Sequence, residues 1–271
     1  MTYVLGSDDP EIKRLDLQAS WLAEPTRLLL RLAGIGPGMR VLDLGTGLGH
    51  VAFALAELVG PTGQVVGIDS ADRMLAVASQ RASGQTHVRF TKGDVRSWTC
   101  DEPFDAVVGR LILFHLPDAV AVVRHHLAHL CQGGRFIGLD FDIGSCRTEP
   151  PIALAELNIR RVVAAFRSAG ADPVIGTRLA LLLADAGLVG PQTFGVQGYI
   201  APDDPRGPVM LTGVVRSLAA QMSAAGIATS AELGIETLQE RLAAELKATR
   251  SVVLPPALVG AWGQLGSSGT P

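Results

Sequence analysis

The stretch 39–56 constrains the fold of this chain more than any other segment. It begins with the apolar run 41–44, which is typical of a buried parallel strand. Glycines occupy alternate positions in 45–49, and a helical pattern starts at His50. A strand, a glycine-rich turn and a helix in this order predict a nucleotide-type binding element, because glycine has no Cβ and lets the backbone approach a ligand closely.

The spacing of the glycines indicates which ligand this element binds. A dinucleotide fingerprint requires G-x-G-x-x-G, and its third glycine would fall at His50. The chain instead carries Gly45, Gly47 and Gly49, with Asp43 two residues before the first of them. This arrangement resembles the first motif of class I S-adenosylmethionine-dependent methyltransferases. A structural turn without a ligand is the alternative, so the interpretation depends on the strands that follow.

Acidic residues also follow the next two predicted strands. Asp69 ends the run 65–68, where a carboxylate can accept hydrogen bonds from both ribose hydroxyls. NAD-binding proteins use the same device, so this residue alone does not separate the two cofactors. Asp94 follows the run 88–90 within Gly-Asp-Val, which resembles the methyltransferase motif whose aspartate accepts from the adenine amino group. An Asx-type turn is the alternative for Asp94.

Strands and helices alternate along most of the chain, which predicts an α/β fold. The resemblance is strongest over 40–142 and implies a doubly wound, mostly parallel, seven-stranded sheet with one antiparallel strand near the end and helical cap insertions. Within one domain it implies an N-terminal helical lid (1–38), an S-adenosylmethionine-binding core (39–146), and the rest of the sheet (147–271) with substrate-cap insertions at about 150–170 and 205–250.

The periodicity places the individual elements. Strands are expected at 41–44, 65–68, 88–90, 104–108, 135–139, 192–200 and 251–265. Helices are expected at 10–32, from 50, at 71–83, from Asp118 to a stop at Gly133-Gly134, at 152–168, from a Thr177 cap to Gly187, at 209–225, and from a Thr229/Glu232 capping box onward.

The resemblance implies S-adenosylmethionine as cofactor and S-adenosylhomocysteine as product. Met74 either covers an adenine face or fills the core. Residues Tyr3–Gly6 together with Leu17 and Gln18 are candidates for a lid, or belong to a helix that only packs on the sheet. By the resemblance, the methionine part contacts Asp43, Gly45, Thr46 and Gly47, the ribose contacts Asp69 and Ser70, the adenine contacts Gly93, Asp94 and Val95, and the amino acid end contacts Arg110.

Two residues are candidates for catalysis. His115 lies in the loop after the fourth predicted strand, and an imidazole can act as a general base near neutral pH. A histidine that only packs is the alternative. Asp140, at the end of the fifth strand, is a second candidate that would orient His115 or bind substrate. His125 and His129 have the i,i+4 spacing of metal ligands, but no nearby carboxylate completes a set, so a solvated helix face is favoured and no metal is predicted. The resemblance leaves open a Mg²⁺ site at Asp140 and Asp142, since some related enzymes bind this ion with carboxylates at strand ends.

Composition restricts the partners. The 271 residues are 48% hydrophobic and carry a net charge of −3 without a basic run, which gives no indication of nucleic acid binding. No apolar stretch approaches the about 20 residues that cross a bilayer, and the N-terminus lacks a signal layout. We therefore expect a cytoplasmic protein with a small-molecule substrate and no membrane contact; a homodimer stays open. The three cysteines indicate neither a disulfide framework nor a zinc site.

The segment after the fourth strand favours a small-molecule enzyme. Residues 109–112 read Gly-Arg-Leu-Ile, which lacks both the Asn/Asp-Pro-Pro-aromatic signature of nucleic-acid base methyltransferases and the glutamate pair of protein-arginine methyltransferases. The resemblance implies methyl transfer to an O, N or C atom of a small hydrophobic metabolite, in natural-product biosynthesis. A non-methylating enzyme of the same fold, catalysing cyclisation or rearrangement, is the alternative. A NAD(P)-dependent oxidoreductase is less favoured, because His50 replaces the third glycine and no Tyr-x-x-x-Lys pair is present.

Overall fold

The structure is a computed structural model that describes residues 9–266. Its main sheet contains β1 (Arg40–Leu44), β2 (Gln64–Asp69), β3 (Val88–Lys92), β4 (Phe104–Arg110), β5 (Leu130–Asp142), β7 (Val189–Val196) and β9 (Ala257–Gln264). The helices are α1 (Asp9–Leu32), α2 (His50–Val59), α3 (Asp72–Arg81), α4 (Ala119–Leu127), α5 (Ala153–Ser168), α6 (Leu179–Ala186), α7 (Arg206–Ala224), α8 (Ser230–Leu233) and α9 (Ile235–Thr249). Shorter elements are the 3₁₀ turns η1 (Leu113–His115), η2 (Ile143–Ser145) and η3 (Ile175–Arg178), and the strands β6 (Arg147–Glu149) and β8 (Val252–Leu254).

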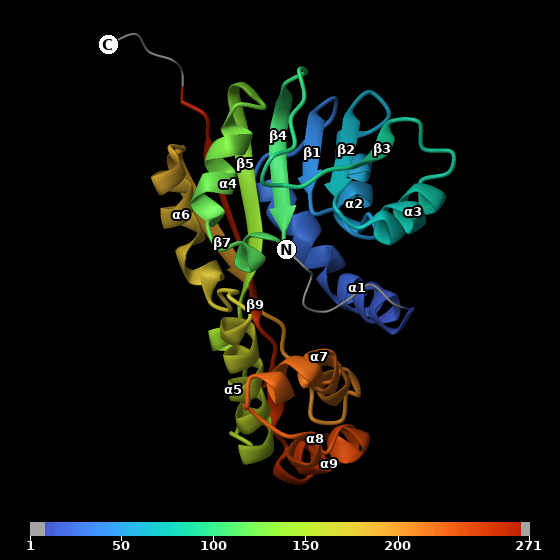
Figure 1. Cartoon of the computed structure of the whole chain (residues 1–271), viewed down its shortest axis with the longest axis vertical. Helices are drawn as coiled ribbons and strands as arrows, with labels where there is room; N and C mark the ends of the chain where they lie inside the picture. Colours follow the sequence, from blue (N-terminus) through green and yellow to red (C-terminus); the bar gives the residue numbers. More distant parts are fainter. Residues whose placement is uncertain (1–8, 267–271) are drawn as a thin grey trace.

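The seven strands of the main sheet lie in the order β3-β2-β1-β4-β5-β9-β7 (Figure 1). β1 to β5 pair in parallel, whereas β9 runs antiparallel to both of its neighbours, β5 and β7. The strand order reverses between β1 and β4, which is the switch point where open α/β sheets bind their ligands. The predicted mostly parallel, seven-stranded sheet is therefore confirmed.

Side chains alternate between the two faces of the sheet, and each face has its own helices. Val41 points to the face that α1 and α2 cover, where Leu29 and Leu55 are fully buried. Leu42 and Leu44 point to the opposite face, which α4 and α6 cover. Each large apolar side chain that is fully buried stabilises the fold by about 1.5–3 kcal/mol.

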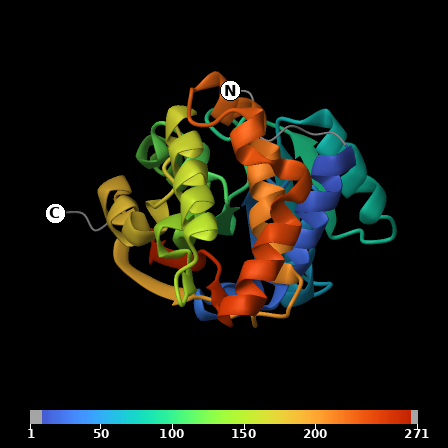
Figure 2. The same ribbon diagram turned by 90° about the horizontal axis from the view of Figure 1, so that it is seen from below.

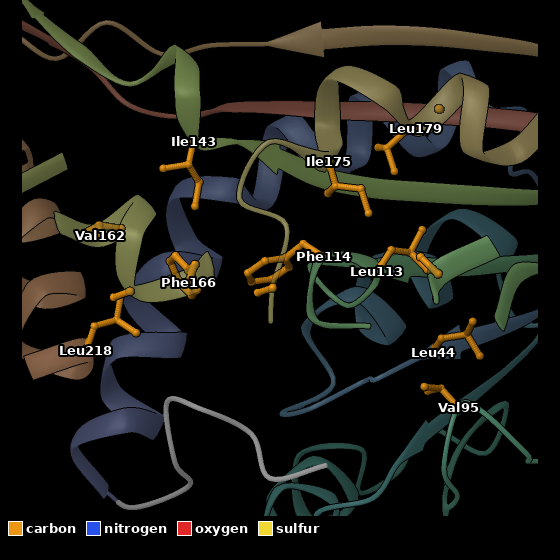
Figure 3. Packing of buried hydrophobic residues seen from close by; sticks show 14 of the residues in the cluster. Leu44, Val95, Leu113, Phe114, Ile143, Val162, Phe166, Ile175, Leu179 and Leu218 are labelled. Carbon is orange, nitrogen blue, oxygen red and sulfur yellow. The ribbon is translucent and has the colours of Figure 1, made fainter. Parts of the chain in front are cut away.

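The core of the second face continues beyond the sheet into the cap, which we define as α5, α7, α8 and α9. Figure 3 shows this continuity, from Leu44 on β1 through Leu113 and Phe114 to Phe166 on α5 and Leu218 on α7. α7 packs against α5, α9 and α1. Seen from below, α7 lies between α5 and α1 (Figure 2). The cap is therefore packed onto the core by apolar contacts.

Residues 201–252 form an insertion that leaves and rejoins the fold at one point, which we call the neck. Ile200 and Val253 form an isolated antiparallel bridge there, with N–H···O distances of 2.9 Å in both directions. The predicted Thr229/Glu232 capping box is present, with the Glu232 amide 3.2 Å from the Thr229 hydroxyl. The helix after it stops at Leu233, because Gly234 adopts φ 53°, and α9 starts from that glycine.

Two predicted boundaries on the α4/α6 side are wrong. The helix capped by Asp118 ends at Leu127 rather than near Gly133, because Leu130 already pairs with Phe104 as the first residue of β5. Thr177 does not cap α6: its hydroxyl donates to the carbonyl of Val174 within η3. The predicted helix end at Gly187 is correct, and this residue has φ 106°.

The predicted final strand, 251–265, is two strands. Pro255 and Pro256 have no backbone N–H, so a continuous ladder is interrupted there. The part before them, β8, pairs with β6 in a separate two-stranded sheet, and the part after them is β9. The strand expected at 192–200 is β7, which begins at Val189 and ends at Val196.

Candidate functional site

One cavity of about 950 Å³ lies at the carboxyl ends of the parallel strands and extends under the cap. Its walls come from the glycine-rich turn, the ends of β2 and β4, η1, and the helices α1, α5 and α7. The structure brings together here the following residues predicted for the site: Gly45, Thr46, Gly47, Asp69, Ser70, Met74, Gly93, Asp94, Val95, Arg110 and His115.

The glycine-rich turn exposes its backbone to this cavity. Gly45 and Gly47 have φ values of 64° and 53°, in the left-handed region that favours glycine. A Cβ at Gly45 would lie 2.9 Å from Cδ1 of Ile112, whereas a Cβ at Gly47 would meet no atom closer than 4.0 Å. Gly45 is thus required by packing, and Gly47 leaves the backbone bare where a ligand can reach it.

Asp43 lies directly behind this turn and does not line the cavity. Its side chain is 1% exposed and accepts a hydrogen bond of 2.6 Å from the Thr46 hydroxyl. Burial raises the pKa of Asp43 to about 7, although the Thr46 hydrogen bond and the Arg110 guanidinium oppose this change. A large fraction of the Asp43 carboxyl groups therefore carries a proton near neutral pH.

Arg110 brings a buried positive charge to the same place. Its Nη1 donates to Thr26 Oγ1 of α1 at 3.0 Å, and burial lowers its pKa to about 10, against the attraction of Asp43. A guanidinium can bind a carboxylate, and a carboxylate can bind an ammonium group. Arg110, which lines the cavity, therefore matches the carboxylate of an amino acid, while Asp43 acts on its charge from behind the turn.

Asp69 is held by the backbone at the tip of β2. One carboxylate oxygen accepts from the Gly47 amide at 2.8 Å, and the other accepts from the Ala71 amide at 2.9 Å. A carboxylate offers about four acceptor positions, so two remain for hydroxyl groups of a ligand. These bonds fix the Asp69 carboxylate against the glycine-rich turn at the wall of the cavity.

Asp94 is engaged by Arg96. The Asp94 carboxylate accepts from the Arg96 backbone amide at 2.9 Å and from Nε of the same residue at 2.9 Å. These hydrogen bonds lower the pKa of Asp94 to about 2. Arg96 also lines the cavity, and an adenine amino group would have to share the carboxylate with this guanidinium.

Helix α1 is fixed across the mouth of the cavity by a polar cluster. Asp16 accepts from His50 Nε2 at 2.8 Å and from both terminal nitrogens of Arg81 at 2.9 Å. Leu17 and Gln18, two residues of the predicted lid, line the cavity. The other predicted lid residues, 3–6, lie outside the described residues.

His115 ends η1 and faces the cavity. Its ring centroid lies 3.7 Å from that of Phe114. Burial lowers the pKa of His115 to about 4, with a smaller contribution from the charge of Arg14. The imidazole is therefore neutral at physiological pH and offers a lone pair, but it is a weak base.

Asp140 does not have the position expected of a substrate ligand. It is fully buried and lies outside the cavity, on the face of the sheet beneath η1. Within residues 9–266, its carboxylate oxygens have no hydrogen-bond partner of good geometry. Burial raises its pKa well above the ordinary value, with the backbone of Leu113 and Phe114 opposing this change. Asp140 therefore lies away from the cavity in which a substrate would bind, and the alternative, that it orients the turn carrying His115, stays a prediction.

The sequence did not identify the residues at the cap end of the cavity. This end is lined mainly by apolar side chains, among them Ile159, Val162, Phe166, Met210 and Val214. Polar side chains are fewer and include Arg14, Arg206, Arg216 and Gln239. Their helical periodicity indicated core-facing helices, but only the fold shows that these faces meet a cavity.

Among residues 9–266, no helix combines the length and the apolar character that crossing a bilayer would require.

Residues 35–170 match a family described as "Methyltransferase domain". The match covers half of the chain, and it spans the glycine-rich turn, the strand ends and η1. The chain belongs to this family, the class I S-adenosylmethionine-dependent methyltransferases.

Two named relatives of this chain are also methyltransferases. Nocamycin O-methyltransferase from Saccharothrix syringae is 34% identical over 65% of this chain and 60% of its own length. The ubiquinone/menaquinone biosynthesis C-methyltransferase UbiE from Pseudomonas putida is 35% identical over 42% of this chain and 46% of its own. The chain thus spans between about half and 60% of the length of these relatives. The solved structure of the YcgJ protein from Bacillus subtilis matches with a TM-score of 0.57, at 22% identity, over 90% of this chain and 100% of that one, which shows the fold.

Proposed function

We propose that this protein transfers the methyl group of S-adenosylmethionine to a small hydrophobic acceptor bound under the cap. The observation that carries the proposal is the continuity of the cavity. The same cavity is lined at one end by the residues that match the cofactor and at the other by the apolar side chains of α5 and α7. A donor and an acceptor can therefore lie next to each other, away from bulk water.

The residues at the strand ends fit S-adenosylmethionine in size and charge. Arg110 would hold the carboxylate of the methionine part, Asp69 the ribose, and Asp94 the adenine amino group, while Asp43 supports the glycine-rich turn from behind through Thr46. The bare backbone at Gly47 gives the space that the ligand needs beside the turn. The bound sulfonium would supply an activated methyl group.

The protein contributes mainly position to this reaction. Holding two reactants in line can supply on the order of 7–11 kcal/mol of the barrier at the upper end. The cap holds an apolar acceptor, and His115 would accept a hydrogen bond from its reacting hydroxyl or amine. A neutral imidazole with a pKa of about 4 suits an acceptor that is itself acidic, such as a phenol or enol, because little proton affinity is then needed.

Two relatives support the substrate class. One is named for O-methylation of nocamycin and the other for C-methylation in quinone biosynthesis. An apolar cap cavity fits a ring-bearing scaffold of this kind. We therefore propose a role in natural-product biosynthesis, with a hydrophobic ring compound as acceptor.

Binding of the cofactor is the first test. We expect isothermal titration calorimetry to show one S-adenosylhomocysteine per chain, with weaker binding to Asp69→Ala and unchanged binding to Asp118→Asn, an exposed carboxylate at the start of α4. No detectable binding of S-adenosylhomocysteine or S-adenosylmethionine to the wild-type protein would refute the proposal.

Methyl transfer is the second test. The protein is incubated with methyl-labelled S-adenosylmethionine and a panel of phenols, hydroquinones and enols, and the label is followed into the organic phase. We expect transfer to at least one acceptor, and a reduced rate for His115→Ala. Conversion of an acceptor without incorporation of the label would instead support cyclisation or rearrangement on the same fold.

A further inference from the structure

Three histidines gather behind the predicted adenine site, outside the cavity. His125 and His126 lie in the last turn of α4, and His129 lies just after that helix. Each can offer one ring nitrogen, and the three nitrogens lie within 4.8 Å of one another. His126 and His129 are 0% and 5% exposed, whereas His125 is half-buried and provides access from the surface.

Hydrogen bonds to the backbone define the tautomers of two of these rings. His125 Nε2 lies 2.9 Å from the Trp98 carbonyl, and His126 Nε2 lies 2.7 Å from the Val95 carbonyl. A carbonyl oxygen only accepts, so each Nε2 must carry the hydrogen. In the neutral rings Nδ1 of His125 and of His126 therefore presents a lone pair.

The third ring completes the group. Nδ1 of His129 lies 3.1 Å from Nδ1 of His126. Zinc binds histidine nitrogen at about 2.0–2.1 Å, so two nitrogens at a tetrahedral angle around one ion are about 3.3–3.4 Å apart. The separation between His126 and His129 is thus close to that of two ligands of one metal ion. All three nitrogens lie within 4.8 Å of one another, so a small shift of the side chains toward the ion would complete the set.

The surroundings match those of metal-binding histidines. Such a histidine nearly always donates its other ring N–H to a carbonyl or carboxylate, which orients the ring, and His125 and His126 both do so.

We propose that His125, His126 and His129 form a binding site for a divalent transition-metal ion such as Zn²⁺, with one nitrogen from each ring and water as ligands. Coordination through Nδ1 requires the other tautomer of His129: its proton moves from Nδ1 to Nε2, the ring stays neutral, and both carbonyl contacts remain in place. Because those carbonyls belong to the loop that carries Asp94, the ion would also stiffen that loop. The site is separate from methyl transfer, and its existence does not depend on the proposed function.

The experiment titrates Zn²⁺ and Co²⁺ into the whole protein after removal of bound metal by a chelator. Calorimetry is expected to show one Zn²⁺ per chain, and Co²⁺ is expected to produce a visible absorption band. His125→Gln and His129→Gln should each weaken Zn²⁺ binding at least about tenfold. His87→Gln, a histidine outside the cluster, is the matched control and should bind as the wild type does.

Thermal unfolding gives a second readout that does not depend on the affinity measurement. Zn²⁺ should raise the midpoint of the wild type and of His87→Gln, and should leave the midpoint of His129→Gln unchanged. Variants at the fully buried His126 are avoided, because they would leave the Val95 carbonyl without its donor. The proposal is overturned if the wild type binds no stoichiometric metal, or if both cluster variants bind it as well as the control does.

Discussion

Replacement of Asp43 by asparagine should stabilise this protein at alkaline pH and at the same time weaken its hold on the cofactor. The carboxyl group is 1% exposed, and burial raises its pKa from 3.8 to about 7. In the unfolded chain it ionises near pH 3.8, so between these pH values folding takes up a proton. The favourable contribution of the protonated group is complete below pH 3.8 and is lost as the pH rises through about 7.

The size of the effect follows from this interval. The range from 3.8 to about 7 corresponds to about 4 kcal/mol of lost stability at pH 8, at 1.36 kcal/mol for each pH unit. An asparagine does not ionise, and its oxygen can still accept from Thr46. Its amide N–H groups would lack acceptors, which costs about 1–3 kcal/mol at every pH. The variant should therefore be the less stable protein near pH 4 and the more stable one, by about 1–3 kcal/mol, at pH 8.

Urea unfolding followed by tryptophan fluorescence at pH 4.5, 5.5, 6.5 and 8 measures this difference. Asp118→Asn is the control, because it removes an exposed carboxylate and keeps a helix-capping side chain. Calorimetry with S-adenosylhomocysteine should show a loss of roughly 1.5–3 kcal/mol in Asp43→Asn, since the charge beside Arg110 is gone. If the stability difference between variant and wild type stays constant across this pH range, the carboxyl group of Asp43 has an ordinary pKa and the reasoning is refuted.

Three further predictions concern the walls of the cavity. Asp69→Ala should weaken S-adenosylhomocysteine binding by roughly 1–3 kcal/mol in calorimetry, and an unchanged affinity would remove this residue from the site. Gly45→Ala should lower the free energy of unfolding by about 1–2 kcal/mol or more, because φ is 64° and the new Cβ would lie 2.9 Å from Ile112; equal urea midpoints would contradict this. His115→Gln should reduce turnover by up to roughly 10²-fold with little change in cofactor affinity. Because the pKa of His115 is about 4, wild-type turnover should not fall between pH 8 and pH 6 through protonation of this ring, and a loss there that the variant lacks would show a higher pKa.

The residues that gather at the strand ends were predictable because the sequence patterns that indicate them are local. The residues of the glycine-rich turn, Asp69 and Asp94 each follow a strand directly, and the fold rule for parallel sheets places such residues at one edge. Arg110 was found in the same way, from its position after the fourth strand. Its electrostatic interaction with Asp43 was not predicted, because the two residues are 67 positions apart and come close only through the parallel pairing of β1 and β4.

The helix that begins after Asp118 was predicted too long because distant strand pairing overrides the local pattern. Leu130 satisfies a helical period after α4, yet it pairs with Phe104 in the sheet.

The position of the Asp140 side chain was not predictable for a different reason. Its place at a strand end suggested a contact with substrate. A side chain at a strand end can point to either face of the sheet, however, and that of Asp140 is fully buried beneath η1. Sequence alone cannot decide that choice when both faces of a sheet are covered.

The neck at Ile200 and Val253 lets the segment 201–252 change in evolution independently of the part of the sheet that would bind the donor. Residues 201–252 meet the rest of the chain through the backbone bonds of the neck, the pairing of Val252 with Glu149, and the contacts of α7 and α8 with α5 and α1, and none of these lies between β9 and its neighbours in the sheet. Diversification can then concentrate in this loop-bounded module while the grip on the adenosyl donor is preserved. We expect chimeras that exchange the module between relatives to retain donor affinity and to accept different ring compounds.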